Sequence, residues 1–388
     1  MNTHRSSSAA SPAAPRLRIA LFTDSYLPTR DGVVSSILAY KQGLEASGHK
    51  MFIFAPEIDG AKKEAGVFRY ASVKFPPYPE YRAAIFPHVS SSLAKKMGID
   101  VVHCKAMITL ALSAAWFAKR AKVPAMASVE TMIPDGMHYI LPIKQAEGIG
   151  RAAAWAYLRW LYSNFKLVTA PSRYTQALLA EHRIESELLP SPVDTERFMP
   201  TNGGAMVKRQ LGIEKKKVVL SVGRIVREKN YSFLLRVAER MRSENAVFLL
   251  VGKGPYLEEL RREVACGGLA DIVKFSGFVP EELLVDYYNS ADAFLFPSQF
   301  ETQGLTLLEA FACGKPACVL DKTPMSEVVR EGANGYKFSL DEKECAEKLC
   351  ACLEKGKKMS SAARSTALDY SIPKCTKKLV GIYRRLKE

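Results

Sequence analysis

The sequence predicts an α/β protein made of two Rossmann-like domains, each a parallel sheet flanked by helices. Short apolar and β-branched runs alternate with helical patterns of roughly 10 to 15 residues, an arrangement typical of parallel strands joined by crossover helices. The 388 residues are more than one ordinary core uses and enough for two. Finally, a stretch rich in proline and glycine interrupts the pattern near the middle of the chain.

Ten apolar runs are the predicted strands. Parallel strands are buried on both faces, so they appear in a sequence as nearly continuous apolar segments. In the first half the runs are Leu17–Thr23, Lys50–Ala55, Val101–Cys104, Ala125–Val129 and Leu167–Ala170, and in the second half Val218–Val222, Val247–Val251, Val273–Phe275, Ala293–Phe296 and Ala317–Leu320.

The boundary between the two units is predicted between Pro190 and Lys208, where prolines and an Asn-Gly-Gly stretch precede the next strand. We therefore assign residues 16–195 to one domain and 196–368 to the other. Apolar residues at helical spacing predict a terminal helix within 369–388, which we expect to pack back on the first domain. Residues 1–15, rich in Ser, Ala and Pro, predict a disordered tail.

The charge and cysteine content narrow the class of protein. The formal charge of +15 is spread along the chain, with 23 basic and 15 acidic residues up to position 195 and 32 and 25 after it. Such a surface suits nucleic acid, anionic lipid or phosphorylated substrates, or reflects solubility alone. No nucleic-acid-binding motif accompanies it, so we expect no nucleic-acid partner.

Eight scattered cysteines without a CxxC pair argue against a disulfide framework or a zinc site and favour a reducing, cytoplasmic compartment. The longest apolar runs fall short of the roughly 18 residues that a membrane span needs. We therefore expect no metal site and no transmembrane segment.

The segment from Glu301 to Pro316 is the strongest chemical signal. A strand leads through a polar loop into a helix that is predicted to begin near Gly304 and to end at Gly314. The free amides and the dipole at such a helix start favour a diphosphate. Glu301 precedes the helix and Glu309 lies more than one turn inside it, so the two carboxylates can reach different parts of one elongated ligand.

Two glycine turns follow predicted strands in the same half of the chain. Gly223 is followed by Arg224 and Lys229, which can grip phosphate oxygens, and Gly252 lies in a second strand–turn–helix pattern. Each turn alone is a weak signal. Together they place phosphate-binding groups at the carboxyl ends of strands of one sheet, where open α/β sheets bind ligands.

At this point the chain resembles a known family, the retaining GT-B glycosyltransferases often called family four, which are related to glycogen synthase and to bacterial lipid mannosyl- and glucosyltransferases. The resemblance runs from Arg18 to Leu386. Its marks are Thr23–Pro28 with Asp31–Val34, Asp100–His103, Ala170–Ser172, Pro192–Asp194 with Phe198, Gly223–Arg224 with Lys229–Asn230, Gly277–Val279, Ala291–Asp292 and Glu301–Pro316.

The resemblance implies a GT-B fold with two parallel sheets facing across a cleft, the acceptor bound by the first domain and the nucleotide sugar by the second. Carried over by position, the substrate-binding residues are Gly32 and Val33 beside the diphosphate, the turns at Gly223 and Gly252, Val279 at the base, Gln303, Gly304 and Leu305 at the phosphate and sugar, and Glu309 at the ribose. Arg224 and Lys229 would neutralise the leaving diphosphate, and Glu301 would bind the donor sugar, which makes these three the expected catalytic residues. No catalytic metal and no cofactor are expected, and a UDP-hexose is the favoured donor.

Two positions depart from the family pattern. The family usually has His-Thr after the fourth strand, whereas this chain has Glu130-Thr131, and a second His is often found where this chain has Lys105. Glu130, kept as a fourth catalytic candidate, could accept a sugar hydroxyl, alter donor choice or mark an impaired enzyme. His138, close by in the sequence, is either a packed histidine or a pocket residue.

The acceptor is the least constrained feature. The Thr23–Pro28 signature resembles relatives that glycosylate diacylglycerol or other lipids at the cytoplasmic face of the membrane, and soluble sugars or polysaccharides are alternatives. Arg151, Trp155, Arg159 and Trp160 belong to one aromatic and basic helix. This helix either packs into the first domain through Trp155, Leu158 and Tyr162, or contacts an anionic membrane peripherally. A catalytically impaired sugar-nucleotide-binding relative is the non-enzyme alternative.

Overall fold

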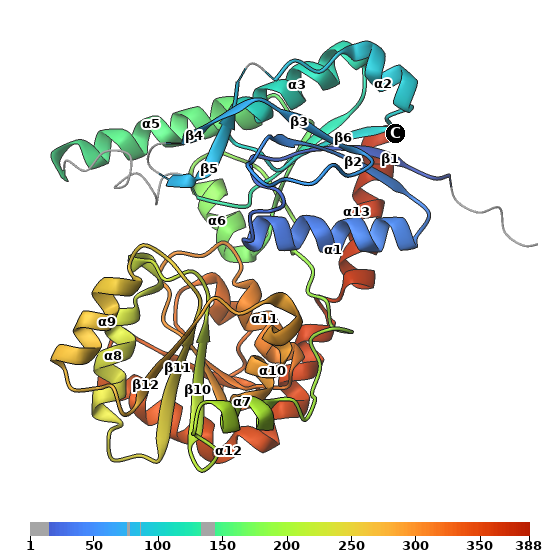
Figure 1. Ribbon diagram of the computed structural model, residues 1–388. Helices are drawn as coiled ribbons and strands as arrows, with labels where there is room; N and C mark the ends of the chain where they lie inside the picture. The colour runs from blue at the N-terminus through green and yellow to red at the C-terminus, as the bar shows by residue number, and fades with distance from the viewer. Residues whose placement is uncertain (1–14, 76–77, 86, 133–143) are drawn as a thin grey trace, which may run out of the picture.

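The computed structural model describes residues 15–75, 78–85, 87–132 and 144–388 and contains two parallel sheets, one above the other in Figure 1. We call the part built on the first sheet the N-domain and the part built on the second the C-domain. The expectation of two Rossmann-like units is confirmed. His138 and residues 1–14 lie outside the described residues.

The N-domain sheet has the strand order β3-β2-β1-β6-β7-β8-β9, and all of its pairings are parallel. A separate antiparallel hairpin, β4-β5, follows β3 in the chain. The bounds are β1 (Arg18–Phe22), β2 (Lys50–Pro56), β3 (Val67–Tyr70), β4 (Ser72–Phe75), β5 (Tyr78–Ala84), β6 (Val101–Cys104), β7 (Ala125–Ser128), β8 (Leu167–Ala170) and β9 (Glu187–Leu188).

Helices cover both faces of this sheet because crossovers between parallel strands are right-handed. The chain proceeds from β1 to β2 in one direction and from β6 to β8 in the other, so their helices lie on opposite faces. One face packs on α1 and on the C-terminal helix α13 (Ile372–Lys387), and the other on α3, α5 and α6. The bounds are α1 (Gly32–Ala46), α2 (Ser91–Met97), α3 (Thr109–Ala121), α5 (Lys144–Tyr162) and α6 (Arg173–Glu181).

The C-domain sheet has the order β12-β11-β10-β13-β14-β15, again all parallel. Its strands are β10 (Lys217–Val222), β11 (Ala246–Val251), β12 (Val273–Gly277), β13 (Ala293–Phe296), β14 (Ala317–Leu320) and β15 (Gly335–Phe338). Its helices are α7 (Gly204–Gln210), α8 (Tyr231–Arg240), α9 (Leu257–Cys266), α10 (Glu281–Ser290), α11 (Leu305–Ala312) and α12 (Glu342–Leu368), with short 3₁₀ turns η2 (Arg227–Lys229) and η3 (Pro324–Glu327).

The chain passes between the domains twice. It leaves the N-domain after β9, and it returns after α12 as α13 (Ile372–Lys387), which buries Leu379, Ile382 and Tyr383 against α1 and β1. The two passages lie side by side, since the amide of Val193 donates to the carbonyl of Tyr370 at 2.9 Å. Figure 1 shows α13, at the red end of the chain, rising from the C-domain into the N-domain.

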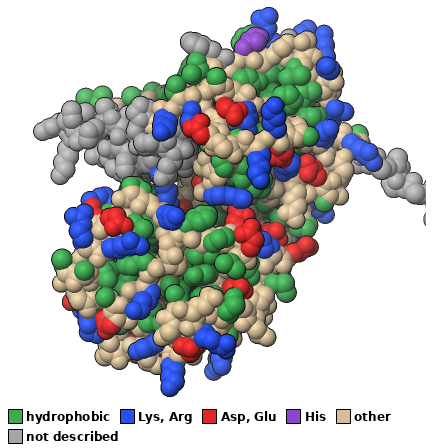
Figure 2. Space-filling view, in the orientation of Figure 1, with side chains coloured by type: hydrophobic (Ala, Val, Ile, Leu, Met, Phe, Trp, Pro, Cys, Tyr) green, Lys and Arg blue, Asp and Glu red, His purple; other side chains and the backbone are tan. Residues whose placement is uncertain are grey.

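Each sheet has one switch point, where the order of strands reverses. In the N-domain it lies between β1 and β6, and in the C-domain between β10 and β13. Loops that leave neighbouring strands in opposite directions open a crevice there, and this is where α/β sheets bind ligands. Among the described helices, none is long and apolar enough to cross a bilayer. Figure 2 shows Lys and Arg side chains over both domains rather than on one.

Candidate functional site

Three glycine turns lie against one another at the carboxyl ends of β10, β11 and β12. The amide of Gly223 donates to the carbonyl of Val251 at 3.0 Å, and that of Gly252 to the carbonyl of Gly277 at 2.9 Å. A Cβ on Gly252 would lie 1.9 Å from the Gly223 carbonyl oxygen. The backbones are therefore packed too closely for a side chain, as in turns that admit a ligand to the main chain.

Lys229 and Glu301 meet at the C-domain switch point. Lys229 ends the turn η2 after β10, Glu301 follows β13, and the two side chains form an ion pair. The hydroxyl of Ser298 also donates to Glu301 at 3.2 Å, and the Lys229 ammonium lies 5.0 Å from the centre of the Phe296 ring. Two residues predicted for different parts of the donor are thus adjacent. Arg224 lies in the loop between β10 and η2 and is half-buried.

The helix α11 begins at the same edge of the sheet. Gly304 caps it with φ of +87°, and a Cβ there would lie 2.7 Å from Met325 and 3.1 Å from Phe296. Only glycine fits this position, for both its conformation and its space. The helix predicted from Gly304 to Gly314 is present as α11, Leu305–Ala312, and the first amides of a helix have no partner within the preceding turn.

The start of α1 in the N-domain faces the start of α11. A Cβ on Gly32 would lie 3.8 Å from the Leu305 side chain, so these two predicted residues come together from different domains. Val33, next to Gly32, packs partly into the N-domain core. Asp31 caps α1 by accepting from the amide of Val34 at 2.8 Å, and the Ser25 hydroxyl donates to its other oxygen at 2.7 Å.

Glu309 lies deeper in the C-domain. The Tyr288 hydroxyl donates to its carboxylate at 2.5 Å, and burial raises the pKa of Glu309 to about 7 although that hydrogen bond opposes the shift. Val279, two residues after β12, has its side chain in the same core. Glu309 lies in the second turn of α11, whereas Glu301 precedes the helix by four residues.

The side chain of Gln303 is engaged within the protein. Its side-chain amide is buried and exchanges two hydrogen bonds with the backbone of Ser191, at 2.7 and 3.0 Å. Ser191 belongs to the passage between the domains, so the Gln303 side chain connects residues 301–304, which we call the donor loop, to that passage. Its backbone amide stays a candidate for contact with the donor.

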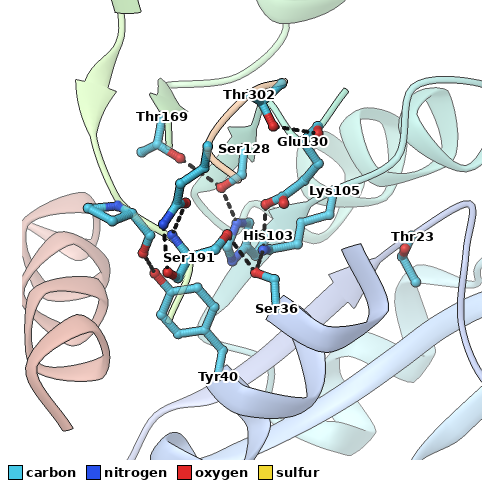
Figure 3. A network of polar contacts seen from close by, with 12 residues as sticks. Thr23, Ser36, Tyr40, His103, Lys105, Ser128, Glu130, Thr169, Ser191 and Thr302 are labelled. Carbon is cyan, nitrogen blue, oxygen red and sulfur yellow. Dashed lines mark hydrogen bonds and ion pairs between the residues drawn. The ribbon is translucent and has the colours of Figure 1, made fainter. Parts of the chain in front are cut away.

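Glu130 and Lys105, the two departures from the family pattern, are partners. The Lys105 ammonium donates to Glu130 at 2.5 Å, with both side chains nearly buried. Figure 3 shows this pair in a network that includes His103. His103 contacts the Tyr383 hydroxyl and the Ser128 hydroxyl, each at 2.7 Å, and burial together with the Lys105 charge holds its pKa well below the usual range.

Asp24 is an acidic residue for which no role was predicted. It follows β1 at the N-domain switch point and accepts from the amides of Met107 and Ile108, which follow β6, at 2.6 and 3.0 Å. Burial raises the pKa of Asp24 to about 6 against these two hydrogen bonds. The available signal in the sequence was its position, since Asp24 is an acidic residue two positions beyond a strand that flanks the switch point.

An ion pair between the domains was also not predicted. Arg30, in the loop before α1, contacts Glu281 at the start of α10, and Arg197 lies 3.3 Å from the other oxygen of the same carboxylate. Arg30 belongs to the N-domain and Glu281 to the C-domain. The loop that leads into α1 at Gly32 is therefore held to the C-domain by an ion pair as well as by packing.

Two family models match the chain, together covering most of it. Residues 30–197 match the model described as Glycosyltransferase Family 4, and residues 206–367 the model described as Glycosyl transferases group 1.

Similar proteins include the alpha-monoglucosyldiacylglycerol synthase of Streptococcus pneumoniae, with 32% identity over 77% of this chain and 70% of that protein. A GDP-mannose-dependent alpha-(1-6)-phosphatidylinositol monomannoside mannosyltransferase of Mycolicibacterium smegmatis has 28% identity over 81% and 83%.

Among solved structures, that of Anabaena HepE in complex with UDP and glucose superposes with a TM-score of 0.74 over 95% of this chain and all of that one, at 17% identity. With its two Rossmann-like domains meeting at their switch points, the chain belongs to the family 4 glycosyltransferases and is an enzyme of the GT-B fold.

Proposed function

We propose that this glycosyltransferase moves a hexose from a nucleotide diphosphate sugar to a membrane lipid such as diacylglycerol, with retention of configuration and without a metal. The observation that carries the donor part is the convergence at one switch point of the glycine turns, the Lys229–Glu301 pair and the start of α11. A diphosphate is bound by cationic side chains and by backbone amides at a helix start, and glycine turns let it come close to the backbone.

The chain's own residues divide the donor between them. Lys229, Arg224 and the amides at the start of α11 would stabilise the negative charge that grows on the leaving diphosphate. Glu301 would accept hydrogen bonds from hydroxyls of the transferred sugar, and Glu309 would accept them from the ribose hydroxyls. Lys229 then has a carboxylate partner before the donor binds and gains the diphosphate afterwards. No step in this scheme needs a divalent cation.

Retention and the lipid acceptor rest on the relatives. Both curated relatives described above are named for alpha-linked products and for lipid-linked substrates. An α-linked nucleotide sugar gives an α-linked product only with retention. A UDP-hexose is our favoured donor, with GDP-mannose as the competing one.

The N-domain carries exposed aromatic residues that suit contact with a bilayer. Trp160 on α5 is 55% exposed, with Arg159 beside it, and Trp116 on α3 is 39% exposed beneath Arg120 at 4.8 Å. Both helices lie on the same face of the N-domain sheet. Trp residues beside cations are favoured at the headgroup layer, so we propose peripheral docking through this face.

One part of the docking prediction was wrong. Trp155 is buried and stacks on the ring of His182, with centroids 3.7 Å apart, so it is not available to a membrane. Leu158 and Tyr162 are likewise in the N-domain core. The packing interpretation of this helix is therefore confirmed for these three residues, and the docking proposal rests on Trp160 and its neighbours.

The experiment is a donor panel with and without lipid. Purified protein is incubated with radiolabelled UDP-glucose, UDP-galactose, GDP-mannose and ADP-glucose in the presence of diacylglycerol vesicles, soluble oligosaccharides or buffer, each with and without EDTA. We expect label from a UDP-hexose in the lipid fraction, unaffected by EDTA, and an α-anomer by NMR. Label only in soluble acceptors would refute the lipid proposal, and loss of transfer with EDTA would refute metal independence.

A further inference from the structure

The Lys105–Glu130 pair is built into the contact between the domains. Lys105 follows β6 and Glu130 follows β7, and their side chains are 1% and 10% exposed. A buried ion pair adds little net stability compared with apolar residues, but removal of one partner leaves a buried charge without compensation. The two residues are therefore expected to depend strongly on one another.

From Lys105 one line of hydrogen bonds leads to the donor loop through α1. The ammonium also donates to the Ser36 hydroxyl at 2.8 Å, and that hydroxyl donates to the Ser191 hydroxyl at 2.8 Å. The Ser191 backbone then exchanges its two hydrogen bonds with the Gln303 amide. Tyr40 lies alongside this line, with its ring 5.1 Å from the Lys105 ammonium.

From Glu130 a second line reaches the same loop directly. The backbone carbonyl of Glu130 accepts from the Thr302 hydroxyl at 3.1 Å. The Thr302 carbonyl is held in turn by the hydroxyls of Ser172 and Thr175, at 2.7 and 3.0 Å. The two lines therefore end on neighbouring residues, Thr302 and Gln303, and together they close a ring.

This ring encloses residues whose placement matters for the donor. Thr302 and Gln303 connect Glu301, which contacts Lys229, with Gly304, which begins α11. Figure 3 shows Lys105 between Glu130 and Ser36, with Thr302 above and Ser191 to the other side. Movement of the Lys105–Glu130 pair would therefore shift the loop that carries the sugar-binding carboxylate.

We propose that Lys105 and Glu130 act jointly as positioning residues for the loop 301–304, and that they hold it against the N-domain in the arrangement that receives the donor sugar. The inference rests on the proposed donor role of that loop. Glu130 is then neither a sign of an impaired enzyme nor a free sugar-binding carboxylate.

The test is a double-mutant cycle with Lys105→Met, Glu130→Gln and the double variant. We expect each single variant to lose tenfold or more in kcat/KM for the nucleotide sugar, mainly through the donor KM, while the double variant recovers most of that loss. Lys105→Arg should keep more activity than Lys105→Met. Binding of UDP alone, measured by calorimetry, should change less than twofold, because it does not need the sugar-binding carboxylate.

Lys208→Met is the matched control. Lys208 and Asp292 form a partly buried pair at 2.9 Å, but Asp292 precedes β13 and so lies at the opposite edge of the sheet. This variant should lower the melting temperature without changing the donor KM. If the Lys105 and Glu130 variants behave in the same way, or if their losses simply add, the positioning role is refuted.

Hydrogen exchange separates this inference from the proposed function. Amides of residues 301–306 should lose protection in each single variant and regain it in the double variant, whatever the donor is. Unchanged protection in the single variants overturns the inference even if the enzyme transfers sugar. Loss of protection in a protein that transfers no sugar from any tested donor would support the ring and refute the proposed function.

Discussion

Two ion pairs, Lys229–Glu301 and Lys105–Glu130, bring together the charged residues of the candidate site. Lys229, Glu301 and Glu309 were assigned to one site from the sequence, because the two carboxylates lie on either side of a helix start and the lysine follows a glycine turn. The ion pair between Lys229 and Glu301 was not predicted. The Lys105–Glu130 pair also had a signal. The two residues follow neighbouring strands by one and two positions and carry opposite charges, but the pairing needs the strand order β6-β7, which periodicity does not supply.

We expect Glu309 to make donor binding dependent on pH. Its pKa in the free enzyme is raised from 4.5 to about 7, so its contribution to stability is complete below 4.5 and is lost as the pH rises through 7. Donor affinity should instead increase as the pH rises, because in our proposal the ionised carboxylate accepts hydrogen bonds from the ribose hydroxyls.

Between pH 6 and 8 we expect the intact nucleotide sugar to bind about tenfold more tightly, following the ionised fraction. Calorimetric titration of wild type at several pH values measures this change. Glu309→Gln should bind weakly and with a flat profile. An equally steep profile in that variant would show that another group titrates.

Lys229 should matter for donor use more than for folding. Loss of a hydrogen bond to a charged group costs about 1.5 to 3 kcal/mol, so Lys229→Ala should lose roughly 10- to 150-fold in kcat/KM for the donor. Lys216→Ala, an exposed lysine before β10 at the far edge of the sheet, is the control and should keep wild-type kinetics. Near-normal kinetics in Lys229→Ala would remove this residue from the donor site.

At the scale of elements, the central strands and the edge strand β12 were predicted, whereas the other edge strands were not. The central strands β6, β7, β13 and β14 are buried at every residue and appear in the sequence as continuous apolar runs. The edge strand β3 is only half-buried throughout, and β9 has two residues, so neither gives a strong pattern. The hairpin β4-β5 and the edge strand β15 were missed as well.

The glycine turns act as one element, which leads to a prediction for Gly252. A Cβ there would meet the Gly223 carbonyl oxygen at 1.9 Å, and the residue has φ of +144°. Gly252→Ala should therefore displace both turns, weaken UDP binding at least tenfold and lower the melting temperature.

Gly268 provides the matched control, because it has φ of +61° but nothing within 4 Å of an added Cβ. Gly268→Ala should introduce only backbone strain. The free energy of unfolding should fall by about 1 kcal/mol and the melting temperature by roughly 2 to 4 °C, with UDP binding unchanged. Equal loss of UDP binding in both variants would show that strain alone, and not the close packing of the turns, governs the site.

For the whole molecule, the face that carries α3 and α5 should decide membrane attachment. Trp160→Ser with Trp116→Ser should reduce co-sedimentation with anionic vesicles several-fold, and Arg159→Glu should reduce it at low salt but little at high salt. The controls on the C-domain are Leu340→Ser and Lys357→Glu, both exposed in the wild type. If the controls have the same effect, or if wild type stays in solution with anionic lipid, docking by this face is refuted.

The two adjacent passages between the domains have a consequence for any attempt to divide the protein. Val193 and Tyr370 join the passages, and α13 supplies Tyr383 to His103 in the N-domain. A protease that cuts only near residue 200 would leave a nicked but associated molecule, since the second passage still connects the halves. Conversely, expression of residues 1–195 alone would give an N-domain with an uncovered apolar face and a histidine without its tyrosine, so the folding unit is not a continuous stretch of the gene.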